Sequence, residues 1–133
     1  MSVFAVGQLN NANGESHRLN RVFQLHPDGF EFRITGTNSE KLKIENANDI
    51  NGGAKTFTVG EPFRGAARYE LNNTRLAVNG AVGTHFTSNS VVTSTALSIG
   101  KSNSDGSLLN GTMNRLTFWK TPFVDNKLDR LTA

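Results

Sequence analysis

Hydrophobic and polar positions alternate with period two along most of this chain. In "FEFRI", residues 30–34, phenylalanine and isoleucine alternate with Glu31 and Arg33, so one face of an extended chain would meet a core and the other water. "EKLKIE", residues 40–45, repeats the pattern. "SVFAVGQL", residues 2–9, is apolar on both faces, which is typical of a strand covered on both sides. The alternation predicts a protein of many short strands.

Turn-forming residues separate these runs at intervals of about eight to twelve residues. Pro27, Asp28 and Gly29 lie between two alternating runs, where proline presets one turn dihedral and glycine accepts a positive φ. The pair Asn72-Asn73 sits between two further runs, as in a tight hairpin. Helical periodicity is almost absent. We therefore predict an all-β fold, an antiparallel two-sheet jelly-roll sandwich, in a single domain over residues 1–133.

The last predicted strand contains an irregularity in its spacing. Met113 and Leu116 are three residues apart, whereas Leu116 and Phe118 are two apart. All three can point into one core only if one residue is inserted between the first two. The spacing predicts a β-bulge near Asn114.

After this strand the pattern changes from period two to helical spacing. Pro122 cannot donate to a strand ladder and would end the pairing. Asp125 is a candidate N-cap, and Leu128 and Leu131 lie three apart on one helical face. We predict a short C-terminal helix near residues 125–131 that seals an open end of the sandwich. A frayed tail is the alternative.

Composition narrows the possible functions. The chain has 133 residues, no cysteine, and a formal net charge of +3 from 14 basic and 11 acidic residues. The absence of cysteine excludes disulfides and thiolate metal sites. The basic residues are scattered among acids, as in "SEKLKIEN" and "DNKLDR", which argues against nucleic-acid binding. No apolar stretch is long enough to span a membrane, and the first residues lack the pattern of a secretion signal.

The closing segment "ALSIGKSNSDGSLLNGTMNRLTFWKTPFVDNKLDRLTA" resembles a known family. It is similar to the end of the concanavalin A-like (laminin G-like) jelly rolls of bacteriophage virion proteins, which include tail fibres, tailspikes and head decoration proteins. "FRGAARYELNNTRLAVNG" resembles the preceding hairpin, which an asparagine-glycine pair turns. The positions that carry the resemblance are Asn79, Gly80, Ile99, Gly100, Asn110, Gly111, Met113, Arg115, Leu116, Phe118, Trp119, Leu128 and Leu131. It covers residues 63–133 well and the earlier residues only in strand pattern.

The resemblance implies a virion structural protein, either a capsid decoration protein or a tail fibre or spike module. Its partners would be other virion proteins and copies of itself. Family members usually have additional strands before the one that "SVFAVGQL" resembles. Either the domain is trimmed, or the chain is a piece of a longer protein, or the first strand exposes an edge that another subunit covers, and we favour the last of these. A neighbouring subunit would then cover this edge through Val3 and Val6, with a trimer favoured.

The alternative function is a lectin-like module that recognises a bacterial surface glycan. Asparagine and aspartate side chains on loops would bond sugar hydroxyls, and an exposed aromatic ring would stack on the sugar. The candidate ligand-binding residues are Asn51, Asn103, Asp105 and Trp119. A core or interface role is the favoured interpretation of Trp119, because Leu116 and Phe118 flank it. The structural role is preferred over the lectin role because the chain has no second module to anchor it.

Enzymatic activity is not expected. Glycosidases need two carboxylates facing one bond, and no strand here carries acids at alternate positions. Asp28 and Glu31 have odd spacing and would lie on opposite faces. His17, His26 and His85 are far apart in sequence and show no catalytic motif.

Neither a metal nor another cofactor is predicted. Asp49 and Asp105 are the candidates for calcium, but each lies in a turn-forming sequence. A calcium ion needs several converging oxygen atoms rather than one isolated acid.

Overall fold

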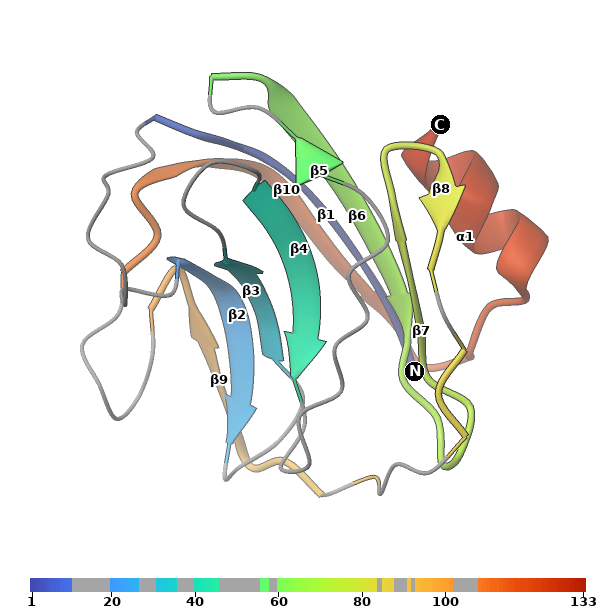
Figure 1. Ribbon diagram of the computed structural model, residues 1–133. Helices are drawn as coiled ribbons and strands as arrows, with labels where there is room; N and C mark the ends of the chain where they lie inside the picture. The colour runs from blue at the N-terminus through green and yellow to red at the C-terminus, as the bar shows by residue number, and fades with distance from the viewer. Residues whose placement is uncertain are drawn as a thin grey trace.

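The computed structural model describes residues 1–10, 20–26, 31–35, 40–45, 56–57, 60–83, 85–87, 91, 93–101 and 108–133. Two five-stranded antiparallel sheets form a sandwich, with the order β10-β1-β6-β7-β8 in sheet A and β5-β4-β3-β2-β9 in sheet B (Figure 1). The elements are β1 (Ser2–Leu9), β2 (Asn20–His26), β3 (Glu31–Thr35), β4 (Glu40–Glu45), β5 (Thr56–Phe57), β6 (Pro62–Arg68), β7 (Arg75–Val78), β8 (Ala81–Val82), β9 (Ala96–Ile99), β10 (Gly111–Trp119) and α1 (Asp125–Thr132). This confirms the predicted jelly roll and its C-terminal helix.

The main core lies between the two sheets. Phe23 of β2 makes edge-to-face contacts with Phe32 of β3 and Phe118 of β10, with ring centres 5.5 and 5.2 Å apart. The other fully buried members of this core are Val3, Ala5, Leu9, Val22, Phe63, Ala67, Leu76 and Val78. The phenylalanine contacts join sheet B to the edge strand of sheet A.

The first strand lies inside sheet A, between β10 and β6. Val3 pairs with Phe118 on one side and Ala67 on the other, and only 1% of its surface is exposed. The prediction of a subunit interface through Val3 and Val6 assumed that β1 is an edge strand, and this assumption is wrong. Val3 belongs to the core and Val6 is half-buried. The strand is apolar on both faces because each face packs on other parts of the same chain.

A second, smaller core lies on the outer face of sheet A, beneath α1. Phe4, Ala66 and Ala77 from three neighbouring strands pack with Phe123 and Leu128. The helix thus covers a face of the sheet, and the prediction that it seals an open end was wrong. Among the described residues, no helix is long and apolar enough to cross a membrane.

The start of α1 also differs from the prediction. The N-cap residue is Val124, in an extended conformation and with no side-chain cap. Asp125 is the first helical residue, and its carboxylate forms ion pairs with Arg68 and Arg75. A carboxylate in the first turn also interacts favourably with the positive end of the helix dipole. Asp125 therefore stabilises the helix start by charge.

The predicted bulge is confirmed. Val6 of β1 pairs with Arg115, but Gly7 pairs with Met113, so Asn114 is the inserted residue on β10. Because of this insertion, Leu116 and Phe118 point to the core, while Arg115, Thr117 and Trp119 point to the outer face.

Of the predicted turns, the one at Asn72-Asn73 lies one residue earlier than predicted, the one at Asn79-Gly80 is confirmed, and the one at residues 27–29 lies outside the described residues. In the first turn, the N–H of Asn73 donates to the carbonyl of Glu70, and Asn72 has a φ of 53°. The pair Asn79-Gly80, with φ values of 45° and 74°, joins β7 to β8 as expected for a tight hairpin. Strands β2 and β3 do pair, but residues 27–30 between them are not described.

Close approach of β1 and β10 depends on glycine on each strand. A Cβ on Gly7 would lie 2.6 Å from the carbonyl oxygen of Thr112 and 2.9 Å from the Phe63 ring. A Cβ on Gly111 would collide with the backbone carbonyl of Gln8. No rotamer change can relieve a clash with backbone.

Gly111→Ala should therefore lower the free energy of unfolding by about 1–3 kcal/mol, as overpacking does. Urea denaturation measures the change, and Thr112→Ala, at an exposed neighbouring position, is the control. A Gly111→Ala variant as stable as the control would show that the two strands separate at no cost.

Candidate binding face between β10 and α1

Helix α1 covers only part of the outer face of sheet A. It contacts chiefly β6, β7 and β8, which leaves the side formed by β1 and β10 less covered (Figure 1). On that side the register places Arg115 beside Val6, Thr117 beside Phe4, and Trp119 beside Ser2. We call this region the β10–α1 face. It consists of Arg115, Thr117 and Trp119 of β10, Phe4 and Val6 of β1, and the flank of α1 that carries Asn126, Lys127, Arg130 and Leu131.

Arg115 is exposed but held in place on this face. Its Nε donates to the Thr117 hydroxyl at 3.1 Å, and its Cζ lies 5.7 Å from the centre of the Phe4 ring. Within the described part of the chain, the Nη1 and Nη2 groups have no hydrogen-bond partner. The guanidinium can therefore donate two parallel hydrogen bonds to a ligand.

Trp119 is half-buried rather than fully in the core. Its ring centre lies 4.8 Å from that of Phe123, at an interplanar angle of 50°. The ammonium group of Lys127 lies 3.7 Å from the centre of the same Phe123 ring. One part of the indole supports the α1 core, and the remaining part is accessible at the surface.

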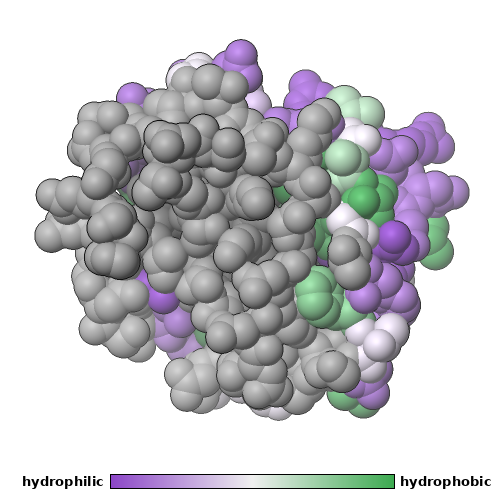
Figure 2. Space-filling view, viewed as in Figure 1, coloured by the Kyte–Doolittle hydropathy of each residue, from purple (hydrophilic) through white to green (hydrophobic). Residues whose placement is uncertain are grey.

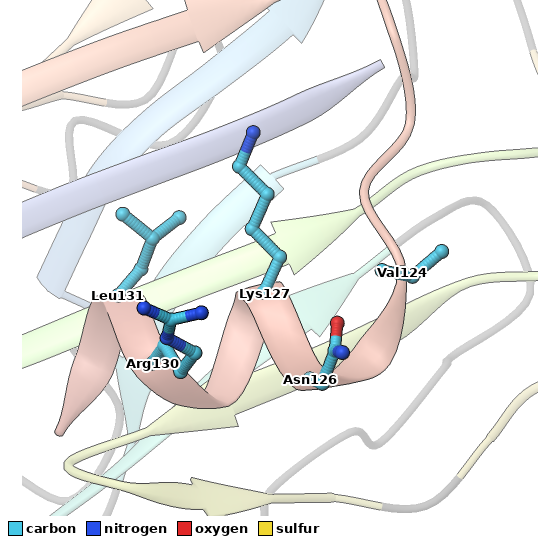
Figure 3. Close-up of a pocket in the computed structure, with 5 residues that line it drawn as sticks. All are labelled: Val124, Asn126, Lys127, Arg130 and Leu131. Atoms are coloured by element: carbon cyan, nitrogen blue, oxygen red, sulfur yellow. The ribbon is translucent and has the colours of Figure 1, made fainter.

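A hollow of about 500 Å³ runs along the flank of α1. It is lined by Val124, Asn126, Lys127, Arg130 and Leu131 (Figure 3). Lys127 and Leu131 extend from the same side of the helix in this view. Among the described residues, the lining includes two cations, an amide and two aliphatic side chains, and no acid.

The two flanks of α1 differ in charge. Asp125 and Asp129 are four residues apart and so share one flank, where Asp125 contacts Arg68 and Arg75. Lys127 lies on the other flank with Leu131. Figure 2 shows hydrophilic residues gathered over α1 with small hydrophobic areas between them. The acids of the helix thus face β6 and β7, and its cations border the hollow.

The structure places few of the predicted ligand residues. Asn51, Asn103, Asp105, Asp49, His17 and Asp28 lie outside the described residues, so their predicted roles stay untested. Among the residues described, no group of three or more histidine, aspartate or glutamate side chains could hold a metal ion. Trp119 is the predicted ligand residue that the structure describes, and it lies on the β10–α1 face.

The two described histidines have separate partners. The Nε2 of His26 lies 2.9 Å from the Ser98 hydroxyl, across β2 and β9 of sheet B. The Nε2 of His85 lies 2.7 Å from the Asn73 Oδ1 near the β6–β7 turn. Each contact joins two segments that are separate in sequence but adjacent in the fold.

Arg115, Thr117 and Lys127 were not predicted from the sequence as binding residues. The signal for the first two was available, because a bulge at Asn114 that points Leu116 and Phe118 inward must point Arg115 and Thr117 outward. Lys127 had no such signal, since its position depends on where α1 packs.

Comparison with known proteins gives a fold but no family. No protein-family model matches the sequence, and no curated protein matches it. Among solved structures, the chain is similar to the CBM40 of the Ruminococcus gnavus IT-sialidase bound to α2,3-sialyllactose, a carbohydrate-binding module. The TM-score is 0.74 with 10% identity, over 99% of this chain and 82% of that one.

A second similar structure is domain 4 of AbnA, a GH43 extracellular arabinanase from Geobacillus stearothermophilus, in complex with arabinotriose. The TM-score is 0.73 with 12% identity, over 99% of this chain and 66% of that chain. Both likenesses show the fold, a jelly-roll-like β-sandwich. Neither neighbour is a phage protein, so the virion part of the resemblance stays a prediction.

Proposed function

We propose that this chain is a non-catalytic glycan-binding module that binds an oligosaccharide on the β10–α1 face. The observation that supports this most is the similarity over 99% of the chain to two domains that were each solved with an oligosaccharide. The predicted virion role and the predicted trimer have no comparable support. Burial of β1 inside sheet A also removes the exposed edge on which the trimer prediction rested.

The β10–α1 face has the side chains that sugar binding needs. The accessible part of Trp119 offers an apolar surface for the C–H face of a sugar ring. The Thr117 hydroxyl, the Asn126 amide and the Arg115 guanidinium offer hydrogen bonds to sugar hydroxyls. Such a site positions a ligand without any group that attacks it.

Binding at a single copy of this face should be weak. The face is open, so a ligand keeps much of its surface in water and buries little area on binding. We expect dissociation constants of about 10 µM to 1 mM, and firm attachment would need several copies acting together.

The test is an immobilised panel of acidic and neutral oligosaccharides, followed by calorimetry on every hit. Trp119→Ala should lower the affinity at least tenfold, because the stacking surface is lost. Leu97→Ala, which shortens an exposed side chain on β9 of sheet B, is the matched control and should bind like the parent chain. Trp119→Phe keeps an aromatic ring and should lose less affinity.

The unfolding temperature of each variant separates lost binding from lost folding. The proposal fails if no oligosaccharide binds. The site assignment fails if Trp119→Ala folds and binds as tightly as Leu97→Ala.

A further inference from the structure

We propose that the oligosaccharide bound on the β10–α1 face is acidic, and that Arg115 binds its carboxylate. This inference rests on the proposed function and specifies the class of its ligand. It depends on the charge and geometry of Arg115 on β10 and of Lys127 and Arg130 on α1.

The first argument is that three exposed cations have no ion-pair partner among the described residues. Arg115, Lys127 and Arg130 are all exposed, and none forms an ion pair within the described part of the chain. The acids of α1 do not neutralise them, because Asp125 is already paired with Arg68 and Arg75 and Asp129 shares its flank. Exposed cations without an ion-pair partner raise the local concentration of anionic ligands.

The second argument is that the Arg115 side chain is already fixed in position before a ligand binds. The hydrogen bond from Nε to Thr117 and the contact with Phe4 fix the side chain before any ligand arrives. Less side-chain entropy is then lost on binding. The two free Nη groups match the spacing of two carboxylate oxygens, a geometry that a lysine cannot reproduce.

The third argument is the length of the face. Arg115 and Trp119 are four residues apart on one strand, which corresponds to about 13 Å. The ammonium group of Lys127 lies over Phe123, the ring that contacts Trp119. A ligand of more than one sugar can therefore place a carboxylate at Arg115 and a ring against Trp119. The site thus favours an acidic oligosaccharide over a single acidic sugar.

The experiment compares ligands that differ only in charge. Trigalacturonic acid is paired with its methyl ester, and α2,3-sialyllactose with lactose. At low ionic strength, at least one acid should bind ten or more times as tightly as its neutral counterpart. This preference should fall with added salt, because exposed charges are screened.

Substitutions then show which cation causes the preference for the acidic ligand. Arg115→Gln should remove most of the preference for the acid, because glutamine keeps a hydrogen-bond donor for either ligand but carries no charge. Arg115→Lys keeps the charge but lacks the paired donors, so it should recover only part of the preference. Lys101→Gln removes one exposed charge near β9 and should change nothing. Unfolding temperatures of all variants should match, since Arg115 is at the surface.

Two results would overturn the inference while leaving the proposed function intact. One is equal binding of acid and neutral ligand by the parent chain, and the other is an equal effect of Arg115→Gln and Lys101→Gln on acid binding. Oligothymidylate is the control for non-specific anion binding. Oligothymidylate binding with the same Arg115 dependence and the same affinity as the acids would also overturn the inference. Absence of binding to every glycan would instead contradict the proposed function.

Discussion

Phe23→Ala should lower the free energy of unfolding by about 3–5 kcal/mol, among the largest effects of any single substitution in this domain. Phe23 is fully buried and contacts the Phe32 and Phe118 rings edge-to-face. Truncation removes both ring contacts and leaves a cavity between the sheets. A rigid sandwich cannot collapse to fill a cavity of this size, so the full cost should be observed.

Urea denaturation followed by far-UV circular dichroism measures this loss. Leu97→Ala is the control, because Leu97 pairs across from Leu25 on the neighbouring strand but is 42% exposed. It should cost less than about 1 kcal/mol. Equal effects of the two substitutions would mean that the sheets are not held together through Phe23.

The strand pattern was predictable from sequence because it depends on neighbouring residues. Period-two alternation determines which side chains can face a core, and this placed Phe32 correctly. The irregular spacing of Met113, Leu116 and Phe118 likewise located the bulge at Asn114. These features follow from strand geometry whatever the strand pairs with.

The coverage of the sheet faces was not predictable in the same way. The apolar outer face of β1 has two possible covers, another subunit or a distant segment of the same chain. The structure shows that Phe123 and Leu128, more than a hundred residues later, pack against Phe4. Because alternation gives no information about such distant contacts, the subunit interface was predicted instead.

The core interpretation of Trp119 is confirmed only in part, because the indole packs against the smaller core but is half-buried. Leu116 and Phe118 are in or against the core, but alternation puts Trp119 on the face opposite to Phe118. Its burial then depends on how far α1 extends over sheet A. The helix contacts chiefly β6, β7 and β8, so the indole remains partly accessible and Arg115 remains exposed.

A buried arginine links the helix to the end of sheet A. The side chain of Arg68 donates to the backbone carbonyl of Asn73 at 2.9 Å, to the Asn73 Oδ1 at 2.7 Å and to the carbonyl of Phe123 at 3.1 Å. It also lies 3.0 Å from the Asp125 carboxylate. These bonds connect the β6–β7 turn with the segment that leads into α1. The arginine therefore helps to position the helix and the edge of the β10–α1 face.

Arg68→Met should lower the free energy of unfolding by about 2–4 kcal/mol. Methionine keeps much of the aliphatic packing but leaves the carbonyls of Asn73 and Phe123 without their donor, and a buried group without a partner costs about 1–3 kcal/mol. The lost attraction to Asp125 adds little, because that carboxylate is 43% exposed and screened by water. Urea denaturation measures the total.

Trp119 is the only tryptophan of the chain, so its fluorescence reports the same change locally. Since Trp119 packs on Phe123, its emission in Arg68→Met should shift to the red at a lower urea concentration than the loss of strand signal. Arg64→Met is the matched control, since Arg64 lies on the same strand and its guanidinium bonds the exposed carbonyl of Ala133 rather than a buried group. It should cost under about 1 kcal/mol and leave the two transitions coincident. If Arg68→Met also behaves in this way, the arginine does not hold α1 on the sheet, and the packing of Leu128 and Phe123 alone keeps the helix in place.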